Sequence, residues 1–345
     1  MKKPSFYISN WMSGVDIHKL KRNIGDKRVY VLDDVKDYEH IKSFLCENDI
    51  EVCGFIGLDE VEKTDADQRP YLIIRSAYDN DMMNKLRSLG YYGNEQMHII
   101  WREVIITDIA GYYCDECGNE IICEDRFEGI ELQFQGYNNK LYIGKNFYAD
   151  GVKIRLKGGA TLEFGPGMGM HNGRMFLKNS VTKFAGNGWL GSDFFISNFD
   201  GTLTVGDDIT CLNGFYMCCV ENTELSIGDG CMFAKNVKLL SGGAHSLFDL
   251  TEKVNLHIAD DVHVRIGDHV WVGMDSAVIY NSDIGEHSMV GAMSLVKGTY
   301  PDHVVIAGNR AKVIRENIDW DYRDYMTYPE YEEMMREREK IKGKK

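Results

Sequence analysis

The sequence predicts a mainly β chain, in which a small α/β unit precedes a longer parallel β-helix built of short repeats. Past residue 140, an aliphatic or aromatic residue followed by a small one recurs about every twenty residues. Within the later coils the finer period is six. Before these repeats, strand-like and helix-like segments alternate between residues 28 and 101.

The longer repeat is typical of a solenoid, in which each coil stacks on the one before it. Its anchor pairs all end in Gly or Ala: Ile143-Gly144, Phe164-Gly165, Phe184-Ala185, Val205-Gly206, Ile227-Gly228, Ile266-Gly267 and Ile284-Gly285. We expect each glycine to relieve the steric cost of a left-handed turn at a corner of the coil.

The six-residue period defines the sides of a coil. Aliphatic residues recur at steps of six: Ile266, Val272, Val278, Ile284, Val290 and Val296. Compact residues follow the first five of these by four positions: Val270, Ser276, Ser282, Ser288 and Ser294. This pattern predicts a short strand and a corner of about 120°, three of which close a triangular coil of about eighteen residues. The spacing does not set the handedness of the coil.

The alternating segments before the repeats predict a small Rossmann-like, parallel α/β domain. Such domains bind nucleotides at a glycine-rich turn after the first strand. Here that turn carries Asp33, Asp34 and Asp37 and has no G-x-G-x-x-G pattern. A structural or acceptor-docking role is therefore favoured over a dinucleotide site.

These observations divide the chain into four parts. We expect an α/β domain over 1–110, a connecting segment over 111–140, a β-helix over 141–314 and a C-terminal helical tail over 315–345. The tail has the interleaved charges of a surface helix.

Composition narrows the function. A formal net charge of −14 disfavours nucleic acid as a partner, because phosphate neutralisation needs clustered Lys and Arg. No apolar run is long enough to span a bilayer, and the N-terminus lacks the apolar core of a secretory signal. We therefore expect a cytoplasmic protein without membrane insertion.

Most of the nine cysteines are expected to be packing residues. The repeat places Cys211 in an inward aliphatic position and Cys231 in a compact one. Cys114, Cys117 and Cys123 offer three ligands where a tetrahedral zinc site needs four, so zinc is the less favoured interpretation there.

One coil is interrupted. The step from Ile227 to Ile266 is nearly double the others, which places an insertion at about 241–260. A loop that breaks a regular solenoid usually serves function. It contains His245, and a histidine can accept a proton from a hydroxyl at neutral pH.

The segment IGDHVWVG…AGNRAKVI, residues 266–314, resembles the C-terminal signature of the hexapeptide-repeat acyltransferases. The preceding GGAHSLFD resembles the G-H-S-[IL]-[FY]-D catalytic-loop motif of their polysaccharide O-acetyltransferase branch. The resemblance implies a left-handed parallel β-helix. It also implies transfer of an acetyl group from acetyl-CoA to a sugar hydroxyl of a bacterial-type surface polysaccharide or its precursor.

The same resemblance assigns roles to residues. It makes His245 the general base, Asp249 its orienter or a substrate contact, and Trp271 a residue at the edge of the site. His171 is a second histidine for which we expect a substrate contact, because a neighbouring subunit could bring it to a cleft. Residues implied in coenzyme A binding are Gly273, Gly291, Ala292, Met293, Ser294, Lys297, Ala307, Gly308, Asn309, Arg310, Lys312 and Arg315.

Two positions depart from the family pattern. Met293 replaces the usual Gly and could narrow the path of the pantetheine, whereas Arg310 replaces the usual Pro and could add a phosphate contact. The implied direct transfer requires no metal. Relatives are usually trimers, so we expect a homotrimer whose interface includes the aromatic residues Phe194, Phe195, Phe199 and Phe215 on the outside of the coils.

Two alternatives stay open. One is an N-acetyltransferase of a nucleotide-linked amino sugar, in which a small α/β domain also precedes a β-helix. The other is a non-catalytic β-helix scaffold or a zinc-dependent carbonic anhydrase relative. The anhydrase would need three convergent histidines, whereas His257, His263 and His269 are spaced by six and fall on successive sides of the coil.

Overall fold

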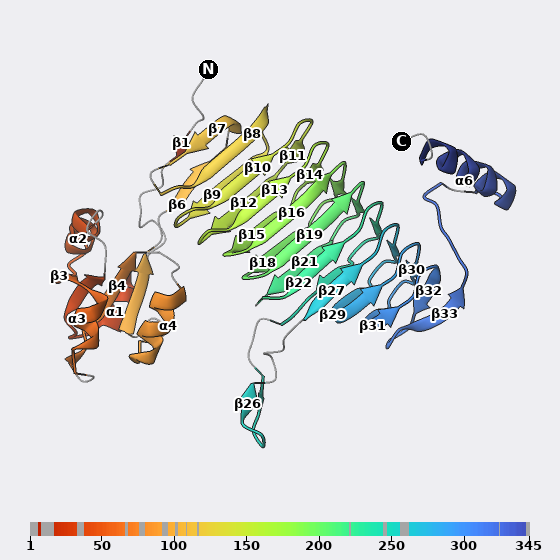
Figure 1. Cartoon of the computed structure of the whole chain (residues 1–345). Coiled ribbons are helices and arrows are strands. Elements are labelled where there is room, and N and C mark those ends of the chain that lie inside the picture. The colour runs from red at the N-terminus through yellow and green to blue at the C-terminus, as the bar shows by residue number, and fades with distance from the viewer. Residues whose placement is uncertain are drawn as a thin grey trace.

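The computed structural model describes residues 6–7, 17–32, 38–65, 68–75, 80–91, 96–100, 103–107, 109–115, 117–220, 222–243, 247–255, 262–323 and 325–342. The chain is mainly β, and its larger part is a β-solenoid with a smaller α/β unit at the N-terminal end (Figure 1). None of the described helices is long and apolar enough to cross a membrane.

The α/β unit is a four-stranded parallel sheet in the order β3-β2-β4-β5. Its elements are α1 (Ile17–Ile24), β2 (Val29–Leu32), α2 (Tyr38–Glu47), β3 (Val52–Ile56), α3 (Leu58–Glu62), β4 (Tyr71–Arg75), α4 (Asn80–Ser88) and β5 (Met97–Ile100). The sequence missed the short helices α1 and α3. The turn after β2, which carries the three aspartates, lies outside the described residues.

Apolar side chains on both faces of this sheet are buried under helices. Val31 and Ile73 pack in one cluster with Leu20 of α1 and Ile41 of α2. Leu72, the neighbour of Ile73 in β4, belongs to a second cluster with residues of α3 and α4. Successive side chains of a strand point to opposite faces, so helices cover both sides of the sheet.

Each coil of the solenoid has three sides. Two sides share an 18-stranded sheet of β1 (Phe6–Tyr7), β6 (Glu103–Ile106), β7 (Ile109–Cys114), β8 (Glu120–Phe127), β9 (Ile130–Gln135), β10 (Lys140–Ile143), β12 (Val152–Lys157), β13 (Thr161–Phe164), β15 (Arg174–Lys178), β16 (Val181–Gly186), β18 (Phe195–Phe199), β19 (Thr202–Asp207), β21 (Tyr216–Val220), β22 (Glu224–Ile227), β24 (Lys238–Leu240), β27 (His263–Ile266), β29 (Ala277–Ile284) and β31 (Leu295–Tyr300).

The third side is a nine-stranded sheet of β11 (Tyr148–Asp150), β14 (Gly169–His171), β17 (Trp189–Leu190), β20 (Thr210–Cys211), β23 (Met232–Phe233), β28 (Trp271–Val272), β30 (Met289–Val290), β32 (Val304–Ala307) and β33 (Lys312–Glu316). Parallel pairing already includes β8 and β9, in the range that we expected to be a connecting segment. Antiparallel strands close both ends: β6 and β7 at the first coils, and β33 at the last. After β33, helix α6 (Tyr328–Lys342) begins thirteen residues after residue 315, the expected start of the tail.

The six-residue pattern is confirmed by burial. All six aliphatic positions from Ile266 to Val296 and all five compact positions from Val270 to Ser294 are buried. Cys211 and Cys231 are buried in the same core, as the repeat predicts, and burial raises the pKa of the Cys231 thiol to about 12.

The prediction that Phe194 and Phe215 lie outside the coils is wrong, because both are buried. Backbone hydrogen bonds align them, coil by coil, with the compact positions Ser276 and Ser294. The early coils are wider: Lys153 lies opposite Arg174, whereas Trp271 lies opposite Met289 only eighteen residues later. A wider coil needs a larger side chain to fill its interior. Phe195 and Phe199 are not in this core, and Phe199 is exposed.

The role predicted for the anchor glycines is also wrong. None of the six described anchor glycines has a positive φ. The left-handed residue comes two positions later at each of these corners: Asn146 (φ 56°), Gly167 (74°), Asp208 (54°), Gly230 (65°), His269 (53°) and His287 (53°). The anchor glycine instead allows close stacking. A Cβ on Gly206 would lie 2.5 Å from the carbonyl carbon of Gly228 in the next coil.

The different roles of the anchor glycine and the left-handed residue predict different effects of substitution on stability at Gly206 and Asp208. Gly206→Asn should lower the free energy of unfolding by about 1–3 kcal/mol, because any side chain there meets backbone. Asp208→Gly should change it by less than about 0.5 kcal/mol, because glycine accepts a left-handed φ at an exposed position. Urea unfolding followed by circular dichroism measures both. Equal tolerance of the two substitutions would contradict the close-stacking role.

Candidate active site

The solenoid is interrupted between the end of β24 at Leu240 and the start of β27 at His263. The exit point is fixed: Ser241 is buried, its side chain bonds the Thr223 hydroxyl, and its N–H donates to the Cys218 carbonyl at 3.0 Å. The chain therefore leaves the regular coil at a defined place, and the segment beyond projects from the solenoid (Figure 1).

The projecting segment contains a hairpin of β25 (Phe248–Asp249) and β26 (Val254–Asn255). The Asp249 carboxylate accepts hydrogen bonds from the Thr251 N–H at 2.7 Å and the Glu252 N–H at 2.9 Å, both through Oδ1. These bonds, that of Glu252 first, lower the pKa of Asp249. An ionised Asp249 thus stabilises its own turn, a role that the sequence analysis did not anticipate.

His245 and His257 lie outside the described residues. The general-base role of His245, and any contact between it and Asp249, therefore stay predictions. His263 is described: it lies in β27 with its Nε2 3.1 Å from Asp283 Oδ2, and its side chain is half-buried.

His171 belongs to a short polar row on the third side of the solenoid. Its Nε2 lies 3.2 Å from Asp150 Oδ2 on the preceding coil, and its Nδ1 lies 2.7 Å from Ser192 Oγ on the following one. The three residues have the connectivity of a nucleophile, a base and an orienting carboxylate. However, the side chains of Asp150 and His171 are partly exposed, at 59% and 35%, so this row lies open to solvent.

The structure brings most of the expected coenzyme A residues to one corner of the last coils. The Gly273 N–H donates to Val290 O and the Gly291 N–H to Ile306 O, both at 2.8 Å, so these glycines stack. The turn at 291–294 is joined to the turn at 307–310, because the Gly308 N–H donates to Ser294 Oγ at 3.0 Å.

The basic residues expected at this site are distributed around that corner. Arg310 lies in the corner itself, whereas Lys312 and Arg315 lie in β33, and all three are exposed. Lys297 lies in β31, with its ammonium group 4.0 Å from the ring centre of Tyr280.

Both departures from the family pattern fall on left-handed residues. Met293 has a φ of 58° and Arg310 a φ of 33°. A glycine adopts this conformation without steric cost, which explains why Gly is usual at position 293. A proline cannot adopt it, because its ring fixes φ near −65°. The Met293 side chain is 74% exposed.

Trp271, expected at the edge of the site, is half-buried in β28, and its ring lies 6.0 Å from that of Trp320. Trp320 stacks on His269 with the ring centres 4.2 Å apart, and its indole N–H donates to the His269 carbonyl at 2.7 Å. The segment after β33 therefore folds back over the corner beside Trp271.

Sequence reasoning missed this contact and treated the tail as a surface helix. The neighbouring residue Asp319 lies 3.1 Å from His287 Nδ1 and 3.6 Å from His269 Nε2. A signal was present, because His269 and His287 are one eighteen-residue coil apart and therefore share a corner.

Among the described residues, Cys114, Cys117 and Cys123 do not form a group that could hold a metal ion. Cys114 is exposed, whereas Cys117 and Cys123 are buried, and burial raises the pKa of Cys123 to about 11. Among the described residues, only His269, His287 and Asp319 form a group of His, Cys, Asp or Glu side chains close enough to hold a metal ion.

Comparison with known proteins yields no matching family model. The chain is 27% identical over 153 residues to a galactoside O-acetyltransferase of Escherichia coli (strain K12), covering 43% of this chain and 72% of that protein. It is 27% identical over 115 residues to a polysialic acid O-acetyltransferase of Escherichia coli O1:K1 / APEC, covering 33% of this chain and only 37% of that protein.

Among solved structures, a polySia-specific acetyltransferase matches with a TM-score of 0.50 and 22% identity. The match covers 60% of this chain and 84% of that one, and it supports the fold. The interrupted β-helix and these relatives define an enzyme of the acyltransferase class. The chain is similar to these O-acetyltransferases, and its β-solenoid agrees with the resemblance of its sequence to the hexapeptide-repeat acyltransferases.

The hydrogen bonds of Asp319 predict how the segment after β33 responds to low pH. Burial would raise the pKa of Asp319, but hydrogen bonds from the Tyr331 hydroxyl, the Trp320 N–H and His287 outweigh it and lower the pKa below its ordinary value of 3.8. A carboxyl whose pKa is lowered in the folded state stabilises the fold at any pH above its ordinary pKa. This contribution is lost as the pH falls through the lowered pKa.

Tyr331→Phe removes the 2.6 Å hydrogen bond to Asp319 Oδ2. The pH at which residues 317–323 lose protection from hydrogen exchange should therefore rise. Tyr328→Phe is the matched control, because the Tyr328 ring is exposed and only 5.9 Å from that of Tyr331. An equal shift in both variants would show that the bond to Asp319 is not the cause.

Proposed function

We propose that the chain transfers an acetyl group from acetyl-CoA to a sugar hydroxyl of a bacterial-type surface polysaccharide or its precursor. The observation that carries the proposal is the break in the solenoid after Leu240, which projects the segment containing GGAHSLFD. The similarity to a galactoside O-acetyltransferase and a polysialic acid O-acetyltransferase supports a hydroxyl of a sugar as the acceptor.

In the proposed reaction, His245 removes the proton of the acceptor hydroxyl while the hydroxyl oxygen attacks the thioester carbonyl. A backbone N–H stabilises the developing oxyanion. The tetrahedral intermediate then expels the coenzyme A thiolate, which takes the proton back from His245. The products are the sugar ester and the free thiol.

Coenzyme A is proposed to bind at the corner formed by 291–294 and 307–310. Exposed Arg310, Lys312 and Arg315 supply positive charge there on a chain whose net charge is −14, which favours the anionic phosphates of this cosubstrate. Assembly as a homotrimer, with the cleft between the β-helices of neighbouring subunits, and location in the cytoplasm belong to the same proposal.

His245→Ala should lower the rate of acetyl transfer by about a hundred to ten thousandfold, because general-base catalysis contributes that much. Release of the coenzyme A thiol and mass spectrometry of an acetylated oligosaccharide measure the rate. His18→Ala, at an exposed position of α1, is the control and should transfer normally. Normal transfer by His245→Ala would overturn the assignment.

The same assay tests the alternative acceptor. With a nucleotide-linked amino sugar in place of the oligosaccharide, the enzyme should release no thiol above the rate of hydrolysis. Acetylation of the amine would favour the N-acetyltransferase alternative.

Asp249→Asn separates two roles of that residue. The amide oxygen can still accept the N–H groups of Thr251 and Glu252, so the hairpin should persist, as judged by limited proteolysis. If the carboxylate charge orients His245, kcat should fall by at least tenfold while the KM for acetyl-CoA stays the same. Asp249→Ala should in addition open the hairpin. An unchanged kcat in Asp249→Asn would leave Asp249 only its role in the turn.

A further inference from the structure

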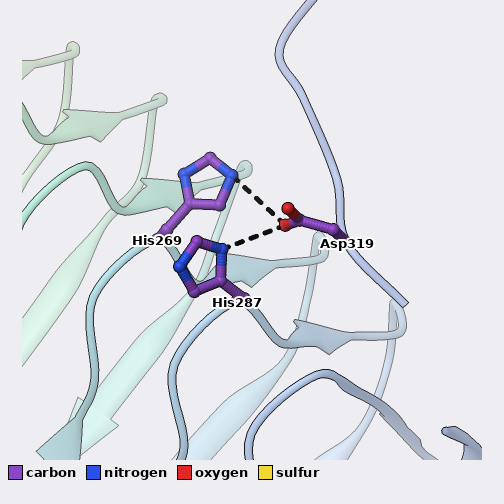
Figure 2. A group of neighbouring side chains, drawn as sticks. All are labelled: His269, His287 and Asp319. Carbon is purple, nitrogen blue, oxygen red and sulfur yellow. Dashed lines mark hydrogen bonds and ion pairs between the residues drawn. The ribbon is translucent and has the colours of Figure 1, made fainter. Parts of the chain in front are cut away.

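Two histidines and one aspartate converge where the C-terminal segment crosses the last coils (Figure 2). His269 and His287 occupy the same corner of consecutive coils, and both have a φ of 53°. Asp319 comes from the segment between β33 and α6. One nitrogen of each imidazole and one carboxylate oxygen lie within 4.8 Å of one another.

The separations match those of ligands around one ion. Two ligands of a tetrahedral zinc ion, with bonds of about 2.0–2.1 Å, lie roughly 3.3 Å apart. Asp319 Oδ1 is 3.1 Å from His287 Nδ1 and 3.6 Å from His269 Nε2, which straddle this value. The third separation, between the two imidazole nitrogens, is within 4.8 Å, so all three atoms border one common space.

The side chains are held in place by their neighbours. The Tyr331 hydroxyl donates to Asp319 Oδ2 at 2.6 Å, so it fixes the carboxylate through the oxygen that does not face the histidines. The stacked Trp320 ring fixes the plane of His269. Such outer contacts orient metal ligands and limit their entropy loss on binding.

The position is sheltered but accessible. The side chains of Asp319, His269 and His287 are 13%, 19% and 32% exposed. The ring of His303 stacks on that of His287 with centres 4.9 Å apart, but His303 does not belong to the group of converging ligand atoms. In the structure His269 Nε2 is 2.7 Å from the Trp320 carbonyl, a bond that an ion would replace.

We propose that His269, His287 and Asp319 bind one divalent transition-metal ion, with zinc as the expected ion. Imidazole nitrogens and a carboxylate oxygen are suitable zinc ligands, and a water molecule would supply the fourth ligand of a tetrahedral ion. The ion would join two consecutive coils to the segment after β33 and would hold Trp320 beside Trp271. This role is structural, and acetyl transfer does not pass through the ion.

The test uses the full chain after treatment with a chelator. Isothermal titration with Zn²⁺ should give one site per chain, and the same protein should unfold at a higher temperature with Zn²⁺ than without. Co²⁺ should give the visible absorption of nitrogen and oxygen ligation, without the thiolate-to-metal band that cysteine ligation would produce. The absence of a stoichiometric site, or a strong thiolate band, would overturn the proposal.

Variants then locate the site. His287→Ala and Asp319→Asn should each weaken Zn²⁺ binding at least tenfold and abolish the rise in unfolding temperature. His263→Ala is the matched control, because His263 also faces a carboxylate, that of Asp283 at 3.1 Å, but belongs to no group of three such ligands among the described residues. It should bind Zn²⁺ as the unaltered protein does. Binding retained in both His287→Ala and Asp319→Asn, with circular dichroism unchanged, would place the ion elsewhere and contradict the proposal.

Discussion

Stacking of one coil on the next, through parallel backbone hydrogen bonds, is the constraint on which the rest of the structure depends. Each side of a coil can bond its neighbours only if the corners bend in the same way at every turn and the backbones approach closely. Two different residues meet these demands: a left-handed one such as Asp208, and a glycine such as Gly206 that leaves space for the coil above. The buried core and the points at which the chain leaves and re-enters the coils are positioned by this register.

The sequence was sufficient for the parts of the fold that repeat. The period of six identifies the buried side chains of the last coils, because each coil there has the same width and the same inward slots. The sequence did not predict that Phe194 and Phe215 are buried. The six-residue pattern comes from the narrow last coils, and it does not show that the wider coils hold aromatic residues at the compact positions. It also misjudged the anchor glycines, because spacing shows that a small residue is needed but not whether φ or close approach requires it.

The candidate site was predictable to a similar degree. Residues such as Gly291, Ser294 and Gly308 lie in consecutive coils, and regular stacking brings them to one corner. The contact of Asp319 with His269 and His287 was not predictable, because it depends on where an irregular segment returns after leaving the repeat. Asp249 shows a third case: a short motif suggests chemistry, while the local backbone also uses the same carboxylate to stabilise a turn.

The antiparallel strands at the two ends of the solenoid have a consequence for the growth of the structure. A parallel β-helix exposes unpaired N–H and C=O groups at its first and last coils, and a second chain could add to them indefinitely. Here β33 turns back on β32, and β6 and β7 run against β9 and β8. Each reversal presents the wrong strand direction to an incoming coil. The reversals therefore hinder end-to-end addition of a second chain on the sides of the coils that they cover.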